Sequence, residues 1–129
     1  MKKVTSILIG LGFTISSSVS YAQNSPKPIE AFSLNEVRLT GGAFLHAQQK
    51  DLDYILSLNA DRLLAPYRKE AGLSVKAPAY GNWESSGLDG HIGGHYLSAL
   101  ALMYASTGDK RLKEKLDYCI AELSLCQQQ

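Results

Sequence analysis

The sequence is poor in the residues that mark several classes of protein. It has only 2 cysteines, 1 tryptophan and 3 histidines, and its formal net charge is +1, with 13 basic and 12 acidic residues. No basic patch indicates a nucleic-acid partner, and no acidic tail indicates a solvating arm. Two cysteines are too few, and wrongly spaced, for a zinc site of the CxxC type.

The sequence also has no apolar run of the roughly 20 residues that a membrane-spanning helix needs. Val4–Val19 is apolar, follows Lys2 and Lys3, and becomes rich in serine near its end. Such a segment is too short to anchor a protein stably in a membrane and is typical of a secretion signal. We predict a signal peptide at residues 1–22, cleaved after Ala22, with a short membrane anchor as the alternative. The mature protein is then expected in the periplasm or outside the cell.

That compartment permits disulfides, but the two cysteines do not suit one. If Cys119 and Cys126 lie on one helix, their seven-residue spacing separates them by roughly 10 Å along the axis. A disulfide needs Cα atoms within about 7 Å. We therefore expect two small apolar residues on a buried helix face.

The first part of the mature chain reads as a leader, a strand and two helices. Residues 23–31 contain two prolines and predict an extended leader. Phe32–Leu39 alternates apolar and polar residues, which predicts a short β-strand whose partner is not in this sequence. Apolar spacing then predicts helices at Ala43–Leu58 and Ala60–Lys69. Asn59 would cap the second helix, which Pro66 should bend or end, and Ala71-Gly72 would close it.

Two arginines of the second helix allow alternative interpretations. Arg62 and Arg68 either belong to a solvated face or fix the following loop through carboxylates. The solvated face is the commoner arrangement for charged residues near a helix end.

The second part reads as a loop and a helical pair. Leu73–Gly94 has no regular period and is rich in glycine. Gly94–Ala105 is apolar all round, which predicts a helix buried on most sides. Thr107-Gly108-Asp109 should end it and cap an amphipathic helix at Lys110–Cys126, with Glu122 on its polar face. A buried helix followed by an amphipathic one suits a barrel of paired helices or a helical solenoid.

The loop and the start of the buried helix carry the candidate functional residues. Trp83 and Glu84 offer a stacking face and a carboxylate, and Asp89 would cap the helix that follows. His91 and His95 are four residues apart, so they would share a helix face, although Gly93-Gly94 makes a helix doubtful there. We consider substrate contact, metal binding and structural hydrogen bonding for the two histidines. Glu84 alone is not a paired-carboxylate glycosidase site.

Several linked motifs resemble one bacterial family. They are LNADRLL at residues 58–64, RKEAGL at 68–73, YGNWE at 80–84 and GHIGGHYLSA at 90–99. In this order they resemble the β-L-arabinofuranosidases of glycoside hydrolase family 127 and their relatives, and the resemblance covers residues 32–127. It implies an (α/α)6-barrel catalytic domain, of which residues 32–129 would be the N-terminal part, preceded by the short strand.

The resemblance also implies a chemistry. The full-length protein would be a secreted retaining glycosidase acting on plant-derived carbohydrate. A cysteine thiolate would be its nucleophile, beside a zinc ion held by a glutamate and further cysteines in the missing C-terminal part of the chain. Cys119 and Cys126 match none of these positions. This part is therefore expected to contain no catalytic residue, metal ligand or cofactor, to be inactive by itself, and not to fold stably alone. Its substrate-binding candidates are Trp83, Glu84, His91 and His95.

Two other functions remain open from the residues. One is a non-catalytic helical carbohydrate-binding or scaffold protein. The other is a different (α/α)-barrel enzyme, such as a polysaccharide lyase. A glutamate with clustered cysteines further along the chain would favour the glycosidase, and a cluster of tyrosine, histidine and arginine would favour the lyase.

Overall fold

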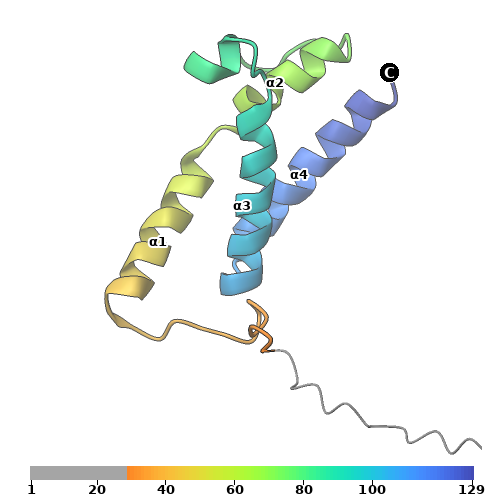
Figure 1. The fold of residues 1–129 in the computed structure, drawn as a ribbon. Helices are drawn as coiled ribbons and strands as arrows, with labels where there is room; N and C mark the ends of the chain where they lie inside the picture. The colour runs from red at the N-terminus through yellow and green to blue at the C-terminus, as the bar shows by residue number, and fades with distance from the viewer. Residues whose placement is uncertain (1–28) are drawn as a thin grey trace, which may run out of the picture. The chain divides into compact units, whose positions relative to one another are not determined.

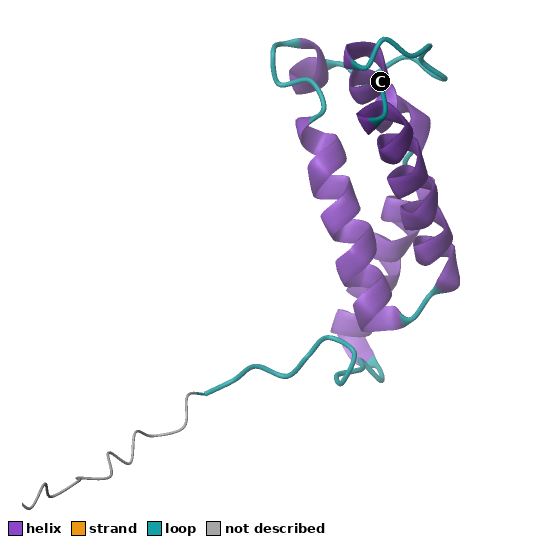
Figure 2. Cartoon of the chain, turned by 90° about the vertical axis from the view of Figure 1, so that its right-hand side faces the viewer, coloured by secondary structure: helices purple, strands orange, loops and turns teal. Residues whose placement is uncertain are grey.

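The computed structural model describes residues 29–129, which form four α-helices and one short 3₁₀-helix (Figure 1). In chain order the elements are α1 (Gly42–Ser57), α2 (Ala60–Glu70), η1 (Asn82–Ser85), α3 (His91–Thr107) and α4 (Lys110–Gln127). None of these described residues belongs to a strand (Figure 2). The mainly α fold class is confirmed. The predicted signal peptide and most of the leader lie outside the described residues.

The predicted strand at Phe32–Leu39 is wrong. Ser33–Glu36 forms a turn instead, in which the Glu36 N–H donates to the Ser33 carbonyl at 2.9 Å. The Ser33 N–H donates to the Glu36 carboxylate, also at 2.9 Å. A strand needs a neighbour for its backbone groups, and residues 29–129 supply none. Here the Glu36 and Arg38 side chains bind backbone groups of this segment instead.

α2 begins and ends where the sequence predicts. The Asn59 side chain accepts hydrogen bonds from the N–H groups of Asp61 and Arg62, at 2.9 and 3.4 Å. These donors have no partner inside the helix, so the cap stabilises the first turn. At the other end Gly72 adopts a left-handed φ of +70°. The N–H groups of Gly72 and Leu73 return to carbonyls of the last turn, as in a Schellman motif.

Pro66 was predicted to bend or end α2, and it does not end the helix. It is buried within the helix, which continues to Glu70. Proline lacks an N–H and removes one backbone hydrogen bond. The preceding residues Leu63 and Leu64 are buried in the core, and this packing offsets the missing bond.

α3 and α4 run antiparallel and pack together (Figures 1 and 2). Gly108, with φ +74°, ends α3, and the Asp109 carboxylate accepts from the Arg111 N–H at 2.9 Å to cap α4, as predicted. α4 also packs against α2, and α1 packs against α3. The buried residues that the helices share are Ile55, Ala60, Leu63, Leu64, Tyr96, Leu100, Leu112 and Cys119.

The irregular segment after α2 is fixed by the two arginines. Arg62 donates from Nε to the Pro78 carbonyl at 3.0 Å, and its guanidinium lies 3.9 Å from the centre of the Tyr80 ring. Arg68 donates from Nε to the Ser74 carbonyl at 2.8 Å. The solvated face is therefore wrong for this pair. The arginines hold the loop, mainly through carbonyls rather than the expected carboxylates.

Glu122 is buried, although its position was predicted to lie on the polar face of the last helix. Its Oε2 lies 2.6 Å from Arg68 Nη1, and its Oε1 lies 2.7 Å from Lys76 Nζ. The Glu122 and Arg68 side chains are only 8% and 10% exposed. A buried carboxylate requires such partners, and Arg68 lies 54 residues away in the sequence. α4 is thereby tied to α2.

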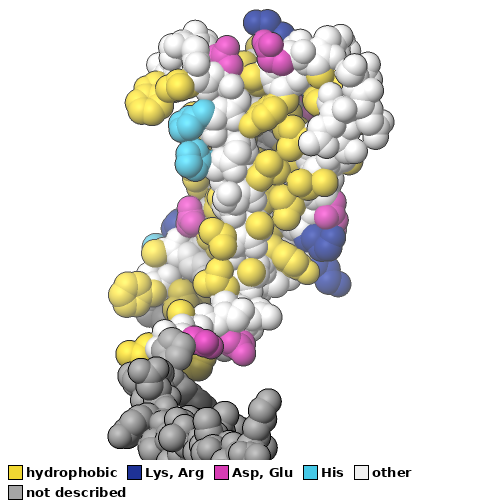
Figure 3. Space-filling view, turned by 45° about the vertical axis from the view of Figure 1, so that its right-hand side comes forward, with side chains coloured by type: hydrophobic (Ala, Val, Ile, Leu, Met, Phe, Trp, Pro, Cys, Tyr) yellow, Lys and Arg dark blue, Asp and Glu magenta, His cyan; other side chains and the backbone are white. Residues whose placement is uncertain are grey.

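Apolar side chains also remain on the surface of the described residues (Figure 3). α3 buries Gly93, Tyr96 and Leu100 but leaves Leu102 57% exposed. Burial of this helix on most sides is therefore not found within residues 29–129. No helix in this range is both long enough and apolar enough to cross a membrane.

Candidate functional site

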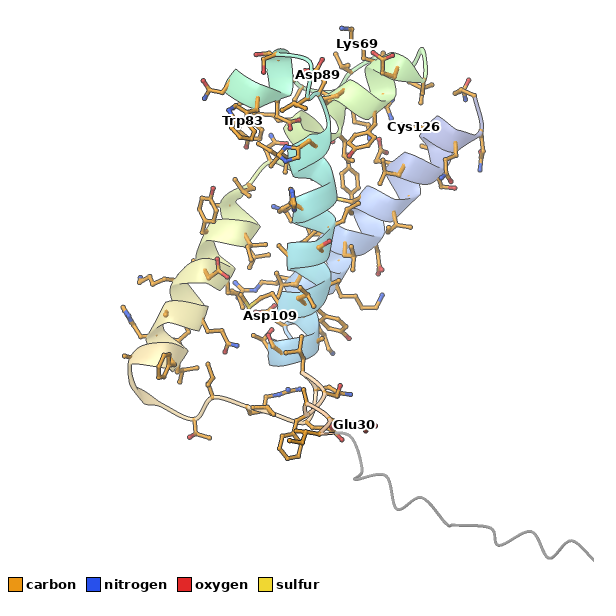
Figure 4. All side chains as sticks on the ribbon, viewed as in Figure 1. Glu30, Lys69, Trp83, Asp89, Asp109 and Cys126 are labelled. Atoms are coloured by element: carbon orange, nitrogen blue, oxygen red, sulfur yellow. The ribbon has the colours of Figure 1, made fainter. Side chains whose placement is uncertain are left out.

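Three of the four predicted site residues lie side by side at the start of α3. Trp83 comes from η1, and His91 and His95 come from the first turns of α3. The Trp83 and His91 ring centroids are 6.0 Å apart, and those of His91 and His95 are 4.9 Å apart in an edge-to-face arrangement. All three side chains are exposed, and we call them the ring row. Figure 3 shows histidine side chains in cyan below hydrophobic atoms at the upper left, and Figure 4 labels Trp83.

The ring row depends on α3 starting earlier than predicted. The helix begins at His91 and runs through Gly93 and Gly94, so the doubt about a helix there was unfounded. Four-residue spacing on a helix then puts His91 and His95 on one face. An indole offers a flat apolar surface, and imidazoles offer hydrogen-bond donors and acceptors. Together they can bind a ligand with an apolar face and several hydroxyl groups.

Glu84, the fourth predicted residue, is buried and does not belong to the exposed ring row. It is 2% exposed. Its Oε2 accepts from the Gly90 N–H at 2.9 Å, and its Oε1 accepts from the Ile92 N–H at 2.8 Å. These donors belong to the start of α3, where a negative charge is favourable. Glu84 therefore caps the helix. The prediction that Asp89 does so is wrong, because the two N–H groups at the start of α3 that bond to a side chain both donate to Glu84, and none donates to Asp89.

Tyr67 holds the same turn from the other side, and the sequence analysis missed it. Its hydroxyl donates to the Gly90 carbonyl at 2.5 Å. Its ring lies so close to α3 that a Cβ added at Gly93 would come within 2.8 Å of Cε2. Burial, and then the nearby Glu84 charge, raise the pKa of the phenol, so it remains a donor at neutral pH. Glycines three residues apart at Gly90 and Gly93 were the available signal for a close neighbour.

The two adjacent glycines of α3 should respond oppositely to alanine. Gly93→Ala forces the new methyl against the Tyr67 ring, so we expect it to lower the free energy of unfolding by about 1–3 kcal/mol. Gly94 has open space around its Cβ position, so Gly94→Ala should raise it by about 0.5–1 kcal/mol through better helix propensity. Thermal unfolding of the two variants checks this. Equal stability of the variants would contradict the close contact.

The described residues do not fit the zinc–thiolate centre that the resemblance implies. Cys119 and Cys126 are both free, and Cys119 is buried in the core with 1% of its surface exposed. Burial raises the pKa of the Cys119 thiol to about 11, which opposes metal binding as a thiolate. Within residues 29–129, no group of three or more His, Cys, Asp or Glu is placed to hold a metal ion. We therefore assign no step of the reaction to zinc through these residues.

Cys119 should resist alkylation while the protein is folded. The thiolate is the reactive species, and burial both hides it and holds its pKa near 11. At pH 8 we expect Cys119 to react with iodoacetamide at least about 100-fold more slowly in the native protein than in urea. Peptide mapping by mass spectrometry at successive times measures both rates. Similar native and unfolded rates would show that α4 does not bury this thiol.

Comparison with known families agrees with the motifs. The fold is mainly α, and an exposed row of aromatic rings lies where its third helix begins. Residues 36–129 match the family described as Beta-L-arabinofuranosidase, GH127 catalytic domain. The chain belongs to this family of glycoside hydrolases. No curated protein matches it.

Proposed function

We propose that residues 32–129 are the N-terminal part of the catalytic domain of a secreted, retaining glycosidase. Its substrate would be a β-linked L-arabinofuranoside of plant-derived carbohydrate. Family membership supports the reaction class. The apolar surface that residues such as Leu102 and Ile120 leave exposed supports packing against further parts of a larger domain. The signal predicted at residues 1–22 supports a periplasmic or extracellular location.

In this proposal the ring row contacts the sugar. The observation that carries it is the exposed indole of Trp83 beside two imidazoles, within the part of the chain that matches the family. The apolar face of a sugar stacks on the indole, and its hydroxyls bond to His91 and His95. The nucleophile and the zinc ligands lie in other residues of the full-length enzyme. Within the full-length enzyme, residues 32–129 then bind and orient the substrate but supply no nucleophile.

Removing the indole should weaken substrate binding in the full-length enzyme. We expect Trp83→Ala to raise the KM for p-nitrophenyl β-L-arabinofuranoside about tenfold, because the stacking surface is lost. Tyr54→Ala is the matched control, since Tyr54 on α1 is 62% exposed and Trp83 is 61% exposed. Its KM should stay within about twofold of the unmodified enzyme. If Trp83→Ala has the KM of the unmodified enzyme, the ring row does not contact the substrate.

The same substrate distinguishes the glycosidase function from the alternative of a carbohydrate-binding protein. The second candidate function is carbohydrate binding without cleavage, which the ring row favours because it offers binding groups but no nucleophile. Calorimetric binding of the glycoside by the full-length protein, with no release of p-nitrophenol, would establish that function instead. The polysaccharide lyase alternative is not retained, because the chain belongs to a glycoside hydrolase family.

A further inference from the structure

The Gly90 residue is held at both of its backbone groups. Glu84 accepts a hydrogen bond from its N–H, and Tyr67 donates one to its carbonyl. Glu84 also accepts from the Ile92 N–H. Glu84 directly follows Trp83 in the sequence, and His91 directly follows Gly90. The bonds that join η1 to α3 therefore lie next to the residues that carry the first two rings of the ring row.

η1 has few other means of holding its position. It begins at Asn82, which has a left-handed φ of 60°, a conformation that asparagine tolerates in turns without support from neighbouring elements. The Trp83 ring is exposed, so its own packing does not fix it. The Glu84 carboxylate is the buried group of η1. Without it, the short 3₁₀-helix would lose its bonds to α3.

We propose that Glu84 is a positioning residue that sets the spacing of the Trp83 and His91 rings and thereby tunes substrate affinity. The inference rests on the proposed function of the ring row. Glu84 does not touch the sugar, because it is 2% exposed and both of its oxygens are bonded to backbone N–H groups. It acts through Trp83, whose ring it holds 6.0 Å from His91 before substrate arrives. Binding then does not have to order the loop, which would weaken affinity.

Kinetics of the full-length enzyme with p-nitrophenyl β-L-arabinofuranoside test this role. Glu84→Gln keeps the shape and one acceptor oxygen but turns an NH2 group toward a backbone N–H. We expect its KM to rise about fivefold, while kcat stays within about twofold. In a Trp83→Ala background the same change should leave KM unaltered, because the ring to be positioned is gone. A purely structural role would lower the active fraction equally in both backgrounds.

Two further variants keep the outcome clear. Tyr67→Phe removes only the bond to the Gly90 carbonyl, so it should give a smaller KM rise, about twofold, that also vanishes in Trp83→Ala. Tyr67→Phe therefore tests the positioning role even if the Glu84→Gln variant does not fold. Glu122→Gln alters a buried carboxylate on α4, away from the ring row, and should leave KM unchanged.

The results separate the two proposals. If Trp83→Ala leaves KM unchanged, the proposed sugar contact fails. If Trp83→Ala raises KM but Glu84→Gln and Tyr67→Phe do not, or if their effects persist without Trp83, the positioning role is overturned and the sugar contact stands.

Discussion

We expect replacement of Glu122 by alanine to lower the free energy of unfolding of the full-length enzyme's catalytic domain by about 3–5 kcal/mol. The change removes the carboxylate between Arg68 Nη1, at 2.6 Å, and Lys76 Nζ, at 2.7 Å. Arg68 is almost fully buried, so its charge would remain in the interior without its partner. The Lys76 side chain is 39% exposed and can turn to water, so Arg68 dominates the loss. Urea unfolding followed by far-UV circular dichroism measures the difference.

A matched control on the same helix isolates burial as the cause. Asp117→Ala also removes one carboxylate from α4, but the Asp117–Lys113 pair is solvent-exposed. It should change stability by no more than about 0.5 kcal/mol. The double change Arg68→Met with Glu122→Leu removes both buried charges and should recover most of the lost stability. Equal losses from Glu122→Ala and Asp117→Ala would contradict the buried pair.

Replacement of Glu84 by alanine should have the second large effect, a loss of about 2–4 kcal/mol in the free energy of unfolding. The carboxylate accepts two backbone hydrogen bonds at 2.9 and 2.8 Å, and hydrogen bonds to a charged group are stronger than neutral ones. The Gly90 N–H would be left buried without an acceptor. The same urea titration measures the loss, and hydrogen exchange should show earlier opening at the start of α3.

Asn59 supplies the comparison for this cap. Its side chain also accepts from two backbone N–H groups, those of Asp61 and Arg62, but it is exposed. Water can replace it, so Asn59→Ala should lower stability by only about 1 kcal/mol. If Glu84→Ala were no more destabilising than Asn59→Ala, the burial of Glu84 would have no energetic consequence.

Local signals predicted the elements whose ends are determined by neighbouring residues. Asn59, Gly72 and Asp109 mark helix ends because their caps bond within a few residues. The predicted strand failed because alternation alone gives no partner for its backbone groups. Glu122 was placed on the exposed face because charge usually indicates exposure. Its position depends on Arg68, which lies on another helix and is invisible to helical periodicity.

The site shows the same division between local and distant causes. The chemistry of their side chains predicted Trp83, His91 and His95 as candidate binding residues, and the structure places these three side by side. Glycine propensity argued against a helix at Gly93, but the close approach of Tyr67, 26 positions earlier, leaves room only for glycine there. The capping role of Glu84 was missed because the carboxylate lies six residues before Gly90, on η1, and not at the position directly before the helix.

A crystal structure of the full-length enzyme soaked with L-arabinose tests the central claim most directly. The account predicts a sugar ring within about 4 Å of the Trp83 indole, with hydroxyl groups bonded to His91 or His95. It also predicts that the Glu84 carboxylate keeps its bonds to the Gly90 and Ile92 N–H groups. A ring row covered by another part of the protein, with the sugar bound elsewhere, would contradict it.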